Sequence, residues 1–316
     1  MEIVNRFFIK SQGDLLFSKL EVKNVLAKKN KFVEDYVFAL MELGTNILKY
    51  PKEGEIWLLK EEDEFLLAAL DRGKGIEDIK WALKEGNSSS KTLGVGLASL
   101  NKLGNFKLSI FSKKNKGTVV LFKPKSLEKE VSFLIRSYMD MKYCGDFILK
   151  KGKFYILADV SGHGLKAKKT ADKVIEFFKS QPLSCVILDD IFKKLHEFIN
   201  QNDLRSVVLS IVEKSRKFLS ICGVGNIKIM LKLTKELKIL TQKSGVIGEC
   251  YTNFSKYTFS DYDVVAVFSD GIEEEVVRDV FLNCDDIHMC AIACVYFSDV
   301  LDDKSILIIR RNNERA

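Results

Sequence analysis

The chain has 316 residues, of which 47% are hydrophobic and 29% are charged, and its formal net charge is +7. This length favours two domains, and the composition is that of an ordinary globular protein, which excludes a disordered or fibrous chain. The opening MEIVNRFFIK lacks the apolar core of a signal peptide, and no apolar run approaches the roughly 20 residues of a membrane span, so we expect a cytoplasmic protein that does not contact a membrane.

The distribution of basic residues and cysteines narrows the kinds of site to expect. The lysines are scattered among acids without interleaved aromatic residues, so we expect no nucleic-acid partner. The seven cysteines contain no CxxC pair. In HMCAIAC, from His288 to Cys294, the other residues are apolar, and small buried side chains are therefore a better interpretation than a zinc site.

A change of composition marks the expected domain boundary. Around Pro124, in FKPKSLEKE, a strand-like run gives way to a charged segment. We therefore predict one domain over residues 1–126 and a second over 127–316.

The first domain has a helix followed by strands in its hydrophobic pattern. Apolar residues recur at helical spacing from Val33 to Leu48, and short apolar runs bounded by charged turns follow. The predicted elements are a helix over 31–50, strands over 55–60 and 64–71, a helix over 94–103, and a hairpin of strands over 106–112 and 117–123.

The second domain is richer in strands. The predicted elements are a hairpin over 146–160, helices over 166–180 and 187–201, a hairpin over 205–226, and strands over 261–270 and 304–311. Strands dominate with few helices between them, which indicates an α+β fold.

One polar pair interrupts the apolar face of the first helix. Glu42 and Asn46 are four residues apart and therefore share a face beside apolar neighbours. Such a pair costs free energy unless it is used, although a solvated helix face is the commoner explanation. Glu42 could orient or deprotonate an attacking hydroxyl, and the amide oxygen of Asn46 suits Mg²⁺.

Two glycine-containing motifs follow this helix. Asp71 ends a predicted strand and precedes Gly73 and Gly75, so its carboxylate could accept a hydrogen bond from a purine amino group. Gly94 and Gly96 precede the next helix and would offer backbone amides to a polyphosphate. The polar stretch KEGNSSSKT between the motifs is typical of a mobile lid. Each motif alone also fits an ordinary turn.

The order of these motifs resembles a known family. ELGTN, DRGKGI, TLGVGLA and the Gly117–Thr118 pair resemble the boxes of the GHKL ATP-binding fold, and ELGTNILKY is most similar to RsbT-like switch serine kinases. The resemblance implies an α/β sandwich that binds Mg-ATP, with Glu42 as base, Asn46 on the metal and Asp71 on adenine. Gly73, Gly75, Gly94, Gly96 and Thr118 would complete the nucleotide site.

The second domain carries aspartates at several strand ends. Asp146 precedes a predicted strand, Asp159 ends its hairpin partner, Asp270 follows DVVAVFS, and Asp302 and Asp303 precede the last strand. A turn explains any one of them. If they met at one sheet end, their repulsion would raise their pKa values unless cations compensated, and such oxygen-only ligands favour Mg²⁺ or Mn²⁺.

DVSGHG, with SDG and DDKSILI downstream, resembles the metal-dependent PPM (type 2C) phosphatases of the SpoIIE-like and RsbX-like class. The resemblance implies a β-sandwich flanked by helices with two Mn²⁺ or Mg²⁺ ions. Asp159 would bridge both ions, the Val160 carbonyl would be a further ligand, Asp270 and Asp302 would hold one ion, and Asp146 would act on the other.

Three further features bear on this second site. His163 would protonate the leaving serine or orient its loop, and Arg136 is a candidate for gripping substrate phosphate. Many relatives carry a second acid where this chain has GDFIL, beginning at Gly145, which implies weaker binding of the second ion.

These resemblances predict a partner-switching regulator that joins a serine kinase to a phosphoserine phosphatase. The expected partners are STAS-domain antagonist proteins and sigma-factor regulators, and a homodimer is compatible with the sequence. Two alternatives remain open: a phosphatase whose first domain senses nucleotide without transferring phosphate, and a non-catalytic anti-sigma binding module.

Overall fold

The computed structural model describes residues 1–27, 32–83, 96–183, 188–234, 236–250 and 253–311. The chain divides into two compact units, Met1–Lys129 and Glu130–Ala316. Within the described ranges, no helix is both long and apolar enough to cross a membrane.

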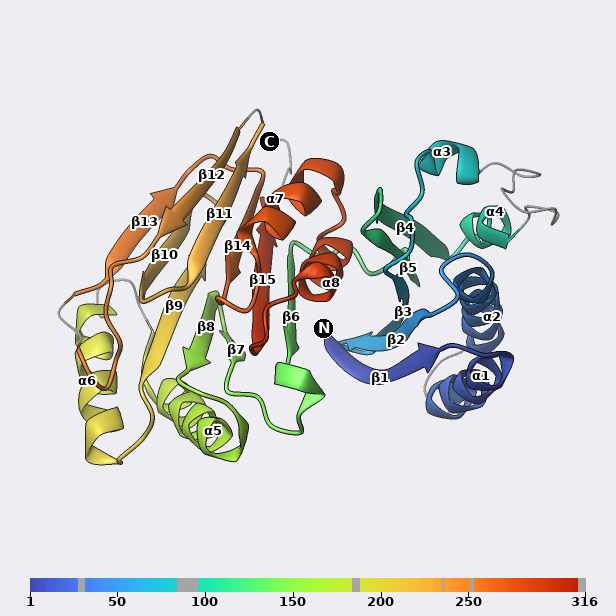
Figure 1. Ribbon diagram of the computed structural model, residues 1–316. Coiled ribbons are helices and arrows are strands. Elements are labelled where there is room, and N and C mark those ends of the chain that lie inside the picture. The colour runs from blue at the N-terminus through green and yellow to red at the C-terminus, as the bar shows by residue number, and fades with distance from the viewer. Residues whose placement is uncertain (28–31, 84–95, 184–187, 235, 251–252, 312–316) are drawn as a thin grey trace. The chain divides into compact units, whose positions relative to one another are not determined.

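The first unit is one antiparallel sheet with helices packed against it (Figure 1). The strand order is β1-β2-β3-β5-β4. Its elements are β1 (Glu2–Ile9), α1 (Gln12–Ala27), α2 (Val33–Lys49), β2 (Gly54–Glu61), β3 (Glu64–Asp71), α3 (Ile79–Ala82), α4 (Gly96–Asn101), β4 (Phe106–Lys113) and β5 (Gly117–Pro124).

Helix α2 anchors the core of this unit. Its predicted apolar face packs on the sheet, and the Tyr36 hydroxyl donates a hydrogen bond of 2.6 Å to the Phe65 carbonyl. The ring of Phe106 stacks on that of Phe122 at 4.4 Å. The predicted helix 31–50 is therefore confirmed over Val33–Lys49. The sequence pattern did not predict α1, because apolar residues lie on both its buried and its exposed faces.

The second unit contains two five-stranded antiparallel sheets, ordered β13-β10-β9-β8-β7 and β12-β11-β14-β15-β6. Its elements are β6 (Val131–Arg136), the 3₁₀ helix η1 (Tyr138–Asp140), β7 (Phe147–Lys151), β8 (Phe154–Val160), α5 (Gly164–Ser180), α6 (Leu188–Gln201), β9 (Val207–Lys214), β10 (Leu219–Val224), β11 (Lys228–Leu233), β12 (Glu236–Thr241), β13 (Ser255–Phe259), β14 (Val264–Phe268), α7 (Glu274–Asn283), α8 (Ile287–Phe297) and β15 (Lys304–Arg310).

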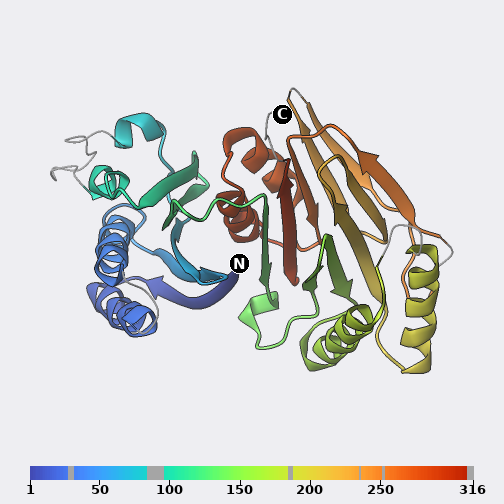
Figure 2. The ribbon, with the colours of Figure 1, turned by 180° about the vertical axis from the view of Figure 1, so that it is seen from behind.

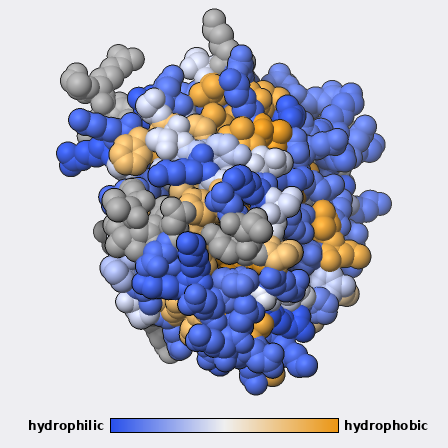
Figure 3. Space-filling view, turned by 90° about the vertical axis from the view of Figure 1, so that its left-hand side faces the viewer, coloured by the Kyte–Doolittle hydropathy of each residue, from blue (hydrophilic) through white to orange (hydrophobic). Residues whose placement is uncertain are grey.

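The sheets of this unit form the middle of a four-layer sandwich (Figures 1 and 2). An apolar core between the sheets draws side chains from β8, β9 and β10 on one side and from β11, β14 and β15 on the other. Helices α5 and α6 pack on the outer face of the β7–β8–β9 sheet, and α8 packs on β6 and β15. Figure 3 looks at the side on which α6 lies, and hydrophilic residues cover most of it.

Strand β8 shows how the sandwich positions a carboxylate. Successive side chains of a strand point to opposite faces. Ile156 and Ala158 belong to the core beneath the helices, whereas Tyr155 and Leu157 belong to the core between the sheets. Asp159 follows the odd-numbered series and therefore faces the space between the sheets, at the end of the strand.

Helices α7 and α8 were not predicted from the sequence. All residues of α8 are buried, so its sequence has no polar face and no helical periodicity. The interpretation of HMCAIAC as small buried side chains is confirmed, since His288 has no exposed surface and Cys290 and Cys294 are buried.

The turn between β4 and β5 gives a test of the first unit. Gly117 has a φ of +123°, and a Cβ there would collide with the backbone carbonyl of Asp71. We expect Gly117→Ala to lower the free energy of unfolding of the first unit by about 1–3 kcal/mol, the usual magnitude of such backbone strain. Urea denaturation monitored by circular dichroism would measure it. Gly104→Ala is the matched control, since no atom lies within 4 Å of its Cβ position, and an equal effect of both substitutions would contradict the argument.

Candidate functional site

Strand pairing in the second unit brings distant carboxylates to one end of the sandwich. Lys304 pairs with Arg136, so the start of β15 lies beside the end of β6. Phe268, at the end of β14, pairs with Ile306 of β15. We use the name aspartate cluster for the five aspartates that this end of the sandwich carries: Asp146, Asp159, Asp270, Asp302 and Asp303.

The aspartates of this cluster repel one another strongly. Burial and the charges of Asp270 and Asp302 raise the pKa of Asp159 to about 7. Burial and the charge of Asp302 raise the pKa of Asp270. The two charges that raise the pKa of Asp159 most, those of Asp270 and Asp302, belong to residues predicted to share its site.

Asp146 is the most deeply buried member. Burial first, and the negative charge of Asp159 second, raise its pKa well above the usual aspartate range. The hydroxyls of Ser269 and Ser305 lower this pKa in part, yet neither oxygen of the Asp146 carboxylate has a partner with hydrogen-bond geometry among the residues that the structure describes. A buried carboxylate without a partner is costly unless a proton or a cation compensates it, so this donor set fits a divalent cation.

The side chains of the aspartate cluster are not arranged in a metal coordination geometry. In the described parts of the chain, no group of three or more His, Cys, Asp or Glu side chains is positioned to hold a metal ion. Asp270 instead accepts a hydrogen bond of 2.6 Å from the Asn226 amide. Ion binding would therefore involve rotation of side chains in the aspartate cluster.

Asp303 has a different position from the other four. It is buried, and its two carboxylate oxygens accept hydrogen bonds of 2.6 Å from the backbone N–H groups of Tyr138 and Gly145. It thereby fixes the segment that leads to Asp146. The sequence places Asp303 among the strand-end acids. Its contact with Gly145 was not predictable, because it joins residues 158 apart in the chain.

The loop after Asp159 is held from one side by an arginine that the sequence analysis missed. Arg205 donates a hydrogen bond of 2.7 Å from Nη1 to the Ser161 carbonyl. The Val160 carbonyl oxygen lies 3.2 Å from the Cβ position of Gly145, so a larger residue there would have to displace it by a few tenths of an ångström. No local pattern marks Arg205, since it precedes an ordinary strand.

His163 and Arg136 lie at this end of the unit. His163 is exposed and precedes α5, and its ring centroid lies 5.0 Å from that of Tyr138. Arg136 ends β6 and forms an ion pair of 2.8 Å with Asp140. A phosphate group would have to compete with Asp140 for this guanidinium.

In the first unit, Glu42 of α2 lies against the start of α4. A Cβ at Gly96 would collide with the Glu42 carboxylate, so the glycine permits this contact. Asn46 lies one turn further along α2 and is half-buried. Gly94 and the expected lid, with Lys91, lie outside the described residues.

A second group forms at the end of β3. Asp71 pairs with Thr118 of β5 and accepts a hydrogen bond of 2.7 Å from the backbone N–H of Gly73. Burial raises the pKa of Asp71. The Ser112 and Thr118 hydroxyls lie 2.9 Å apart, and Gly75 packs against the backbone of β4. The hydrogen bond to Gly73 is also what a plain turn would make.

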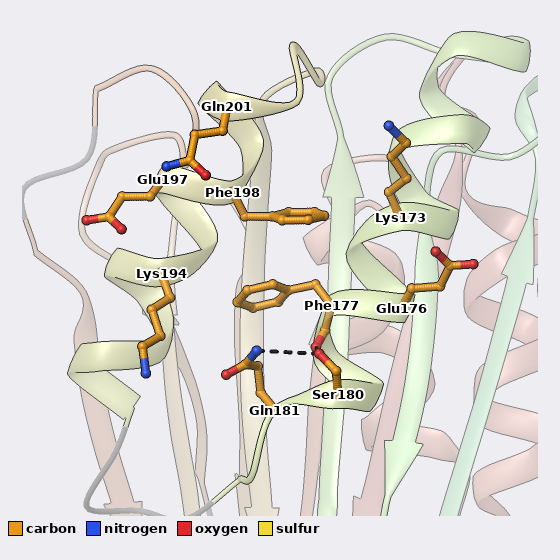
Figure 4. Close-up of a pocket in the computed structure, with 9 residues that line it drawn as sticks. All are labelled: Lys173, Glu176, Phe177, Ser180, Gln181, Lys194, Glu197, Phe198 and Gln201. Atoms are coloured by element: carbon orange, nitrogen blue, oxygen red, sulfur yellow. Dashed lines mark hydrogen bonds between the residues drawn. The ribbon is translucent and has the colours of Figure 1, made fainter.

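A pocket of about 510 Å³ lies apart from both groups, between α5 and α6 (Figure 4). The rings of Phe177 and Phe198 face each other across it at 5.1 Å, and Gln181 donates a hydrogen bond of 3.4 Å to Ser180. None of the site residues expected from the sequence lines this pocket.

Comparisons with known proteins agree with this geometry for the second unit. Residues 151–293 match the family model of stage II sporulation protein E (SpoIIE). No curated protein matches the chain by sequence. A crystal structure of RsbX in complex with magnesium has a TM-score of 0.50 at 16% identity, and the match covers 58% of this chain and 98% of RsbX.

Two other solved structures are less similar. PppA of the type VI secretion system of Pseudomonas aeruginosa has a TM-score of 0.48 at 12% identity, covering 58% of this chain and 97% of PppA. The catalytic domain of PstP has a TM-score of 0.47 at 12% identity, covering 57% of this chain and 96% of that domain.

The SpoIIE match and the RsbX fold together support a SpoIIE-type PPM phosphatase domain in this chain. The α+β prediction with a PPM-like sandwich is thus confirmed at the level of the fold.

Proposed function

We propose that the second unit is a metal-dependent phosphatase that hydrolyses phosphoserine or phosphothreonine in proteins. The observation that carries the proposal is that the pairing of Phe147 with Ala158 brings the buried Asp146 and the half-buried Asp159 together at the end of the sandwich, where both have raised pKa values. The SpoIIE match across residues 151–293 and the fold shared with RsbX, which was crystallised with magnesium, support it.

The ion-binding residues that we propose are Asp146, Asp159, Asp270, Asp302 and the Val160 carbonyl. When bound, Mg²⁺ or Mn²⁺ ions would lower the pKa of water and neutralise charge on the phosphate. Without such ions the ionised members of the cluster would repel the dianionic substrate.

The other residues of the site would position these groups. Asp303 holds the segment before Asp146 through its hydrogen bonds to Tyr138 and Gly145, and Arg205 holds the loop after Asp159. His163 is exposed at the same end, where it could give a proton to the leaving serine or threonine oxygen. Arg136 could bind the phosphate if it left Asp140.

Asp159→Asn tests the assignment directly. We expect the Mn²⁺-dependent hydrolysis of a phosphoserine peptide to fall to the level of the EDTA-treated protein, because the substitution removes the carboxylate that faces the other acids. Phosphate release would measure the rate. Asp172→Asn, on the exposed face of α5, is the matched control, and unchanged activity of Asp159→Asn would refute the proposed role.

The raised pKa of Asp159 also predicts how stability depends on pH. In the folded state this carboxyl keeps its proton up to about pH 7, whereas its ordinary pKa is 3.8. The folded state therefore binds more protons than the unfolded state between these values, and stability falls as the pH rises through this window. Above about pH 7 the carboxyl is ionised in both states, and the stabilisation that its proton gave the folded state is lost.

We expect the free energy of unfolding of the EDTA-treated protein to fall by up to about 1.4 kcal/mol per pH unit across this window for one group. Urea titrations at a series of pH values would measure it. Mn²⁺ should flatten the dependence, and Asp159→Asn should flatten it without metal. If the free energy of unfolding of the wild type and of this variant had the same pH dependence in EDTA, the pKa of Asp159 would not be raised in the folded state.

For the first unit, we propose an ATP-dependent serine kinase that acts on STAS-domain proteins in a partner-switching pathway. The support is the order of the ELGTN, DRGKGI and TLGVGLA motifs, the contact of Glu42 with Gly96, and the pairing of Asp71 with Thr118. In this proposal Glu42 is the base, Asn46 a ligand of Mg²⁺ and Asp71 the partner of the adenine amino group.

Glu42→Gln separates the kinase from a unit that only senses nucleotide. The substitution keeps the size of the side chain but removes the base, so we expect phosphate transfer to a STAS domain to be lost while ATP affinity stays within about twofold. Transfer of labelled phosphate and calorimetric ATP binding would measure the two effects. Asp71→Asn should instead weaken ATP binding. Absence of transfer by the wild type, with normal ATP binding, would favour the nucleotide sensor.

A further inference from the structure

Two cysteines, Cys284 and Cys290, lie close together at the junction of α7 and α8. Cys284 follows the last residue of α7, and Cys290 lies in the first turn of α8. The Cys290 thiol donates to the Cys284 carbonyl at 3.7 Å, and the Cys284 thiol donates to the Asp286 carbonyl at 3.6 Å. The Cys290 backbone N–H donates a hydrogen bond of 2.8 Å to the same Asp286 carbonyl, so the two cysteines converge on one short segment.

The two thiols are chemically unequal. The neighbouring Cys290 thiol lowers the pKa of Cys284. Burial and the carboxylates of Asp286 and Asp285 act in the opposite direction. The same contact, with burial, raises the pKa of Cys290 well above its usual range. One sulfur is thus suited to act as the nucleophile and the other to remain a thiol beside it.

The surroundings of the pair make Cys284 the accessible partner. Cys284 is half-buried, whereas Cys290 is buried. The Lys232 ammonium group of β11 donates a hydrogen bond of 2.6 Å to the Phe281 carbonyl and lies 3.5 Å from Asp285, whose side chain is 98% exposed. Lys232 thus neutralises part of the charge of Asp285, one of the two carboxylates that act on Cys284.

We propose that Cys284 and Cys290 form a dithiol that reacts with hydroperoxides and closes to an intramolecular disulfide. The SpoIIE match and the proposed phosphatase activity do not enter this inference, which rests on the approach of the Cys290 thiol to Cys284 at a half-buried junction.

The reaction balances with hydrogen peroxide as the oxidant. The Cys284 thiolate attacks one peroxide oxygen, the O–O bond breaks, and the hydroxide that leaves takes a proton to become water, which gives a sulfenic acid. The Cys290 sulfur then attacks the Cys284 sulfur, the S–O bond breaks, and a second water leaves with the Cys290 proton. Two thiols thus give two electrons to one peroxide.

The position of the pair gives the disulfide a structural consequence. It would tie the first turn of α8 to the end of α7. Helix α8 packs on β6 and β15, and the chain after α8 leads directly to Asp302 and Asp303. The cross-link would therefore restrain the helix that supports the strands next to the aspartate cluster.

The test is to oxidise the reduced full-length chain with hydrogen peroxide, block free thiols with N-ethylmaleimide, and map the products by peptide mass spectrometry. We expect a Cys284–Cys290 disulfide that dithiothreitol reverses. Cys290→Ala should stop the reaction at a sulfenic acid on Cys284 that dimedone traps, and Cys284→Ser should abolish both products. Cys250→Ser, at an exposed cysteine outside the pair, should leave the disulfide unchanged.

Several outcomes would overturn the proposal. Oxidation of Cys250 before Cys284 would show that exposure alone governs the reaction. A disulfide that maps to Cys294, the buried thiol one turn further along α8, would show that the pair is misassigned. A wild-type chain that keeps both thiols free in peroxide would exclude the dithiol without any variant, so the result does not depend on the folding of a mutant.

Discussion

The second unit depends on how repulsion among the aspartates at one end of the sandwich is relieved. Burial and the charge of Asp159 raise the pKa of Asp146, and burial with the charges of Asp270 and Asp302 raises that of Asp159. Such a group of acids destabilises the fold that contains it unless protons or cations bind. Because both oxygens of Asp146 lack a hydrogen-bond partner among the described residues, the fold does not relieve the repulsion itself. The cations that we propose for this site would relieve it.

The strands make this arrangement possible at little cost to the core. Alternation along β8 places Tyr155, Leu157 and Asp159 on one face, so two apolar residues fill the space between the sheets before the carboxylate reaches its end. Asp303 then uses both its oxygens on backbone N–H groups. Its charge is compensated locally, and it can fix the segment before Asp146 without needing an ion. Two adjacent aspartates thus differ in their partners: Asp303 holds a distant segment, whereas Asp302 accepts a hydrogen bond of 2.8 Å from the backbone N–H of Asp303 itself.

The features that the sequence predicted are those with a local physical cause. The amphipathic face of α2 and the strand-end aspartates are local patterns, and each reflects a local cause: burial of one face, or the end of a buried strand. The contacts of Asp303 and Arg205 were not predictable, because each joins residues far apart in the chain. Helix α8 was missed for the opposite reason. It is buried on every side, so no polar residue marks its period.

The two candidate sites differ in how far their ligands are coupled to folding. At Asp71, the N–H of Gly73 supplies a partner within two residues, so the carboxylate can be tolerated without nucleotide. At the aspartate cluster no such partner exists for Asp146, and a cation that binds only the folded state stabilises it in proportion to the logarithm of its concentration above the dissociation constant. The proposed ion binding and the stability of the second unit would consequently be one equilibrium, whereas Asp71 in the first unit has a hydrogen-bond donor that belongs to the chain itself.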